Sequence, residues 1–73
     1  MAVQIVMDLT GDTRHEFNTG DAAAVAEAER RFKQLTRAGF TAAVRTAEGR
    51  SELIRNFNPD AEETLFFPRL RGG

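Results

Sequence analysis

The stretch AVQIVMDLTGDTRHEF, residues 2–17, contains two strand patterns separated by a turn. Within Ala2–Asp8, alternate residues are apolar, which is typical of a strand with one buried face: Val3, Ile5 and Met7. Leu9–Asp12 supplies turn residues, among which Gly11 can take a positive φ. Thr13–Phe17 then reads as a second short strand. The stretch therefore predicts a β-hairpin at the start of the domain.

A single amphipathic helix is predicted after this hairpin. Asn18–Asp21 is a helix-start cluster in which either Thr19 or Asp21 can cap a helix over residues 21–38. Gly39 is placed to end it in a left-handed conformation. Apolar residues fall on one stripe of this helix: Val25, Ala28, Phe32 and Leu35. The helix is therefore expected to pack by that stripe against a sheet.

The remaining chain predicts a second hairpin and a last strand. The expected strands are Phe40–Thr46, Glu52–Phe57 and Thr64–Phe67. Pro59 is placed to open a single helical turn over residues 58–63, and Pro68 is expected to stop the last strand. The predicted class is α+β, with one helix across one face of a mixed sheet of about five strands. Residues 1–68 form this domain, and residues 69–73 are expected to be a flexible tail.

Composition narrows the function classes. The chain has 73 residues, no cysteine and a formal net charge of −1. Disulfides, thiolate metal sites and a cysteine nucleophile are excluded, and binding to nucleic acid or an anionic membrane is disfavoured. The sequence has neither a signal-peptide pattern nor a membrane-spanning run. We expect a cytoplasmic monomer.

No catalytic site of its own is predicted. His15 is the only histidine, and no serine or cysteine nucleophile is evident beside it. Acidic pairs such as Glu62 with Glu63, or Asp8 with Asp12, are interpreted as solvated loop residues rather than metal ligands. The chain is therefore not expected to be an enzyme, nor to hold a metal or cofactor.

Two parts of the sequence resemble the ubiquitin family. Residues 69–73 read RLRGG, which is the ubiquitin ending residue for residue. In the first hairpin, Gln4-Ile5 and Leu9-Thr10-Gly11 followed by Thr13 match the ubiquitin pattern, with a loop one residue shorter. The alanine-rich helix and Pro68 depart from it, which indicates a diverged relative of prokaryotic type. The resemblance implies the β-grasp fold, with the first and last strands paired in parallel at the sheet centre.

The resemblance also implies a function for the tail. In that family an activating enzyme uses ATP and magnesium to adenylate the C-terminal glycine carboxylate, which passes to a thiol and then to an amine. Gly73 would be activated, with Gly72 allowing close approach of the backbone. Three further tail residues would be recognised by the activating enzyme: Arg69, Leu70 and Arg71. The implied partners are activating and conjugating enzymes, a deconjugating protease and target proteins.

Other positions carry expectations of their own. The resemblance implies a partner surface that would include Leu9, Arg45 and Phe67, although a charged Arg45 makes eukaryotic-type receptors unsuited. Lys33 is the single lysine and would be the chain-forming amine. Two alternatives stay open: a sulfur carrier that forms a terminal thiocarboxylate, and a β-grasp binding module that is never conjugated. Whether Gly73 is encoded as the end or exposed by processing is also open.

Overall fold

A computed structural model describes residues 1–68 of the 73-residue chain. The expectations placed on the tail, residues 69–73, lie outside the described residues. Five strands and one helix follow one another along the chain: β1 (Ala2–Asp8), β2 (Gly11–Phe17), α1 (Ala22–Arg37), β3 (Phe40–Arg45), β4 (Ser51–Ile54) and β5 (Glu63–Pro68). No helix within these residues is long and apolar enough to cross a membrane.

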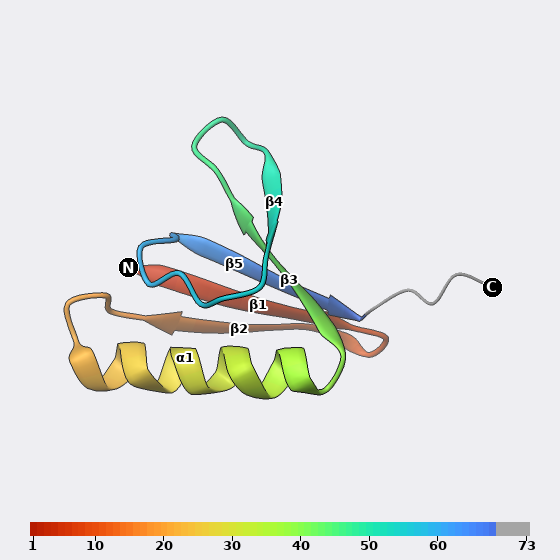
Figure 1. Ribbon diagram of the computed structural model, residues 1–73, viewed down its shortest axis with the longest axis horizontal. Coiled ribbons are helices and arrows are strands. Elements are labelled where there is room, and N and C mark those ends of the chain that lie inside the picture. The colour runs from red at the N-terminus through yellow and green to blue at the C-terminus, as the bar shows by residue number, and fades with distance from the viewer. Residues whose placement is uncertain (69–73) are drawn as a thin grey trace.

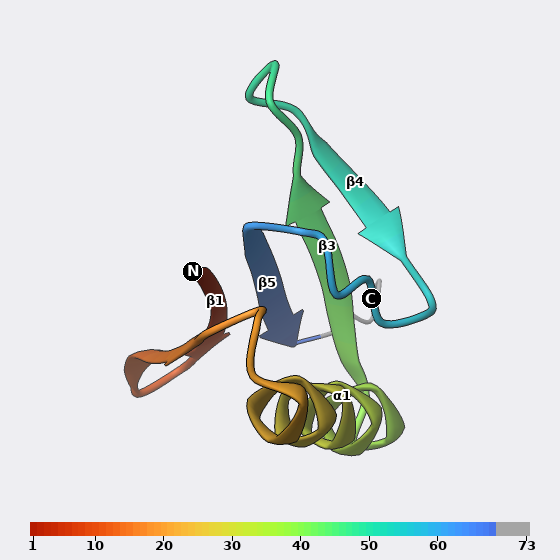
Figure 2. The same ribbon diagram turned by 90° about the vertical axis from the view of Figure 1, so that its left-hand side faces the viewer.

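The strands form one mixed sheet in the order β2-β1-β5-β3-β4 (Figure 1). β1 and β5 pair in parallel, whereas β1 with β2, β3 with β4 and β3 with β5 are antiparallel. Figure 2 shows α1 seen along its axis on one side of the sheet, with no element on the other. The predicted α+β class and β-grasp layout are confirmed, including the parallel pairing of the first and last strands.

The helix begins and ends where its sequence indicates. Asp21 is the N-cap, and its carboxylate accepts hydrogen bonds from the backbone N–H groups of Ala23 and Ala24. At the other end Gly39 has a φ of 102°, a conformation that disfavours any side chain. The predicted stripe faces the sheet: Ala28 and Phe32 are buried, and Val25 and Leu35 pack against the core.

The core between helix and sheet has two neighbouring clusters. One contains Ala2, Phe17 and Ala28. The other contains Phe32, Ala42 and Phe66, where the rings of Phe32 and Phe66 meet edge to face with centroids 5.6 Å apart. Partly buried Phe57 packs against both clusters. Phe32 and Phe66 are the two largest fully buried side chains and form the centre of the core.

The residues of β1 that face the helix are not the alternating apolar set of the sequence analysis. Ala2 and Gln4 are buried beneath α1, and Val6 packs against the Phe32 cluster. Val3, Ile5 and Met7 therefore lie on the side without a helix, because successive strand residues point to opposite faces. Both sets are mainly apolar, so alternation alone does not say which one meets the helix.

Several boundaries also differ. β4 is shorter than predicted and ends at Ile54, so residues 55–57 are not in a strand. The single helical turn predicted over residues 58–63 is instead a hydrogen-bonded turn, in which the Ala61 N–H donates to the Asn58 carbonyl over 3.2 Å. The Asn58 side chain accepts from the Asp60 N–H as well, as an N-cap does, but the chain does not continue into a helix.

Candidate functional site

The sheet face opposite α1 is the main candidate surface, and we call it the free sheet face. The strand register defines its members, since residues paired across a ladder share a face. Its apolar residues are Val3, Ile5, Met7, Ala43, Leu53, Leu65 and Phe67. Its charged residues are Asp12, Arg14, Glu16, Arg45 and Glu63. The apolar group lies mainly on the three central strands, and the charged group lies around it.

This face is only partly shielded by its own neighbours. Ile5 and Ala43 are buried within the sheet surface. Val3, Met7, Leu65 and Phe67 remain half-buried with no helix above them. Leu53, on the edge strand β4, is 73% exposed. A face with this many apolar side chains on adjacent strands is typical of an interaction surface.

The turn between β1 and β2 projects a single apolar side chain. Leu9 is fully exposed at its tip. The Asp8 carboxylate fixes the turn by accepting from the Thr10 N–H over 2.7 Å and from the Thr10 hydroxyl over 2.6 Å. These bonds from Thr10 also hold the pKa of Asp8 below its ordinary value. Leu9 is thus presented by an ordered turn at one end of the sheet.

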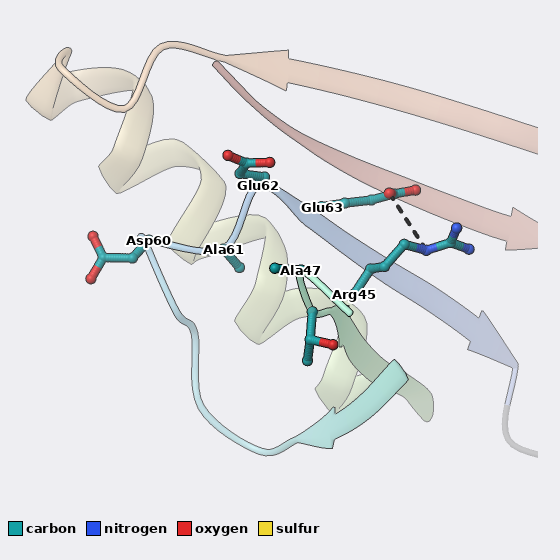
Figure 3. A pocket seen from close by; sticks show the side chains of 7 residues that line it. Arg45, Ala47, Asp60, Ala61, Glu62 and Glu63 are labelled. Carbon is teal, nitrogen blue, oxygen red and sulfur yellow. Dashed lines mark ion pairs between the residues drawn. The ribbon is translucent and has the colours of Figure 1, made fainter. Parts of the chain in front are cut away.

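Arg45 lies at the other end of the sheet. Its Nε atom is 3.7 Å from a carboxylate oxygen of Glu63, the first residue of β5 (Figure 3). The two line a shallow pocket of about 440 Å³ together with residues that include Asp60 and Glu62. Figure 3 shows Glu63 directed toward Arg45 and the Asp60 carboxylate directed away. Within the described residues, no three acidic or histidine side chains are grouped as metal ligands.

The three predicted surface residues lie in different parts of the sheet. Phe67 lies on the free sheet face, where it is paired with Thr41 of β3. Arg45 is the last residue of β3 and is paired with Ser51, two positions beyond Ala43, so it lies at the rim near the pocket. Leu9 and Arg45 are brought to opposite ends of the sheet. Leu53 joins this surface through strand pairing and was not anticipated from the sequence. The interpretation of Glu63 as a solvated loop residue is wrong, because it begins β5 and pairs with Arg45.

Lys33 lies on α1 away from the sheet. Its side chain is 66% exposed, and its ammonium nitrogen is 3.7 Å from a carboxylate oxygen of Glu29, one turn earlier. Such an exposed pair is worth only about 0.3 to 0.5 kcal/mol, so it leaves the amine accessible. The tail residues of the candidate site, 69–73, lie outside the described residues.

A buried polar connection joins the helix to β1, and sequence patterns did not reveal it. Gln4 is fully buried and donates from Nε2 to the Ala28 carbonyl over 2.9 Å. Its side-chain oxygen accepts from Arg31 Nη1 over 2.8 Å. Because both ends of the amide are satisfied, burial of Gln4 carries no unpaired polar group. A glutamine in an otherwise apolar strand was the one available signal.

His15 is paired with Gln4 across the β1 and β2 ladder. Burial lowers the pKa of His15, and the positive charge of Arg31 lowers it further. The folded state therefore favours the neutral imidazole. No nucleophile accompanies it on the described elements that flank it, so we interpret His15 as a structural residue of β2.

The depressed pKa of His15 predicts a pH dependence of stability. The contribution of neutral His15 to the free energy of unfolding is fully present above the unfolded-state pKa of about 6.5. It is lost as the pH falls through that value toward the folded-state pKa, because the unfolded state then binds a proton that the folded state does not. Urea unfolding between pH 5 and 7.5 should show a steeper loss of stability in the wild type than in His15→Gln. Parallel pH profiles for the two proteins would contradict this assignment.

Comparison with known proteins gives no relative. No protein-family model, no curated protein and no solved structure matches this chain.

Proposed function

We propose that the protein is a ubiquitin-like modifier, activated by adenylation at the Gly73 carboxylate and conjugated to amines of target proteins. The observation that supports this most strongly is the RLRGG sequence placed directly after a β-grasp domain. β5 is a central strand that ends at Pro68, adjacent in sequence to Arg69. The domain would act as a handle that enzymes recognise, and the tail as the reactive end.

The partner surface would be the free sheet face together with the Leu9 turn. Phe67 and Leu65 offer half-buried apolar contacts, and Arg45 offers guanidinium donors at the rim. Leu9 is fully exposed, so a partner can contact it without any rearrangement of the domain. Activating and conjugating enzymes and a deconjugating protease would bind here while the tail reaches their catalytic centres.

Mass spectrometry of the native host's proteins, after capture of an N-terminally tagged chain, tests this function. Trypsin cleaves after Arg71 and would leave Gly72-Gly73 attached to each target lysine. Targets carrying this dipeptide support a modifier, and Gly73→Ala should greatly reduce them because a Cβ hinders threading of the tail. A free chain whose terminal carboxylate has one oxygen replaced by sulfur would indicate the sulfur carrier. Captured partners with neither modification would indicate the binding module.

The single lysine predicts that targets receive mainly one modifier each. Lys33 and the Met1 amine are the only primary amines in the sequence, and an arginine guanidinium stays protonated and is no acyl acceptor. Intact-mass analysis of conjugates should show single modification, and short polymers should disappear in Lys33→Arg with a blocked N-terminus. Abundant polymers that persist in that variant would show that another acceptor is used.

A further inference from the structure

We propose that the free sheet face also binds a second copy of this chain, forming a weak symmetric dimer face to face. This inference is independent of conjugation, since it rests on the arrangement of charges and apolar residues within the sheet. It also limits the expected monomer to low protein concentration.

The strand register arranges the face in rows that run across the sheet. One row starts at Glu16 on β2, passes through Val3 and Glu63, and reaches Arg45 on β3. The next row runs from Arg14 through Ile5, Leu65 and Ala43. The acidic Glu16 and the basic Arg45 thus lie in the same row, separated by Val3 on β1 and Glu63 on β5.

A two-fold axis parallel to the strands, between β1 and β5, makes this face complementary to itself. It places β1 of one copy on β5 of the other, so that Ile5 meets Leu65 and Val3 meets Glu63, whose carboxylate keeps Arg45 of its own copy as partner. It places β2 on β3, so that Glu16 meets Arg45 of the second copy, and the symmetry repeats each contact. Aligned packing of two sheets in this way is a common arrangement.

The charges also disfavour the other simple arrangement. An axis in the interface but perpendicular to the strands would lay β2 on β2 and oppose Glu16 to Asp12 of the second copy, which is a repulsion between two acids. Within residues 1–68, Glu16 has no ion-pair partner, and Arg45 has only Glu63, at 3.7 Å. The Arg45 side chain is 53% exposed, so its guanidinium can receive a second carboxylate.

The size of the face sets the strength of the interaction. With this axis four strands of each copy face one another, because β4 extends past β2 of the second copy. Four strands about 4.8 Å apart, with three rows about 6.6 Å apart, cover on the order of 400 Å² per copy. The total of roughly 800 Å² lies below the about 1,000 Å² of a stable specific interface, so the dimer should be weak and dissociate readily. Because it covers Arg45 and Phe67, self-association and partner binding at this face would exclude each other.

Sedimentation equilibrium of the full chain over micromolar to millimolar concentration tests the dimer. The apparent mass should rise from 8.1 kDa toward twice that value. Amide NMR shifts in β1 and β5 should change with concentration, while those on the exposed side of α1 should not. A wild type that stays monomeric at millimolar concentration, or whose shifts change on the helix instead, would overturn the proposal.

Charge reversal provides a sharper test. Glu16→Arg and Arg45→Glu should each lower the self-association constant at least tenfold, because like charges then face each other. An equimolar mixture of the two variants should associate again, since the two substituted positions then face each other with opposite charges and the second contact keeps its wild-type pair. Arg30→Glu, an equal charge change on the exposed side of α1, should leave the wild-type association unchanged. Association by either single variant at wild-type strength, or no association in the mixture, would show that this face is not the dimer interface.

Discussion

Replacing Phe66 by alanine is expected to lower the free energy of unfolding by about 3 to 5 kcal/mol. Phe66 is fully buried at the centre of the core, edge to face with Phe32. Truncating such a phenylalanine costs about 3 to 5 kcal/mol, since transfer energy is lost and a cavity remains. A domain of 73 residues has a total stability of about 4 to 11 kcal/mol. Chemical denaturation should therefore show a transition midpoint well below that of the wild type.

Phe67 provides the matched control for this change. It is adjacent in sequence and in the same strand, but it lies half-buried on the free sheet face. Phe67→Ala should lower the free energy of unfolding by only about 1 kcal/mol. The half-buried ring of Phe67 removes less apolar surface from water than the fully buried ring of Phe66, so less is lost on truncation. Equal destabilisation by the two substitutions would mean that the assignment of faces along β5 is incorrect.

Deleting Gly73 is expected to abolish adenylation under the proposed function. In that reaction a carboxylate oxygen of Gly73 attacks the α-phosphorus of ATP and pyrophosphate leaves. Removal of one residue withdraws the carboxylate by about 3.5 Å, and a misplacement of even 1 Å can cost about 100-fold in rate. ATP–pyrophosphate exchange with the cognate activating enzyme should fall by at least that factor. Addition of one residue after Gly73 should have the same effect.

The fold should be unaffected by either change. The sheet register and both core clusters are formed by residues up to Pro68, so thermal unfolding should match the wild type. One residue added before Met1 serves as the length control and should leave exchange intact. Normal exchange by the protein without Gly73 would exclude both the modifier and the sulfur carrier, and only the binding module would remain.

Sequence patterns predicted the order of elements because each signal was local. Asp21 marks the start of α1 by its capping carboxylate, and Gly39 marks the end because it lacks a Cβ and can take a positive φ. The helical stripe likewise needs no knowledge of the sheet. The facing of β1 was not determined in this way. Gln4 is buried only because the Ala28 carbonyl and Arg31 reach it from the helix, and such partners are 24 and 27 residues away in sequence.

The candidate surface was predictable only in part. Leu9 and Phe67 could be selected from the resemblance to the ubiquitin partner patch, but the sequence did not say which of Phe66 and Phe67 is buried. Glu63 beside Arg45, and Leu53 beside Ala43, depend on the alignment of strands that are distant in sequence. Residue spacing along one strand carries no information about that alignment, so the charged rows of the face became visible only in the structure.

The parallel ladder between β1 and β5 has a consequence for protein synthesis. It pairs Val3 with Glu63, so β5 is synthesised only about 60 residues after the β1 residues that it pairs with. Until then the emerging chain holds a hairpin whose β1 edge is unpaired, and such edges are prone to pair with other chains. Contacts this distant in sequence also slow folding. Ribosomal products that stop before residue 63 should therefore remain unfolded, aggregate readily and be degraded.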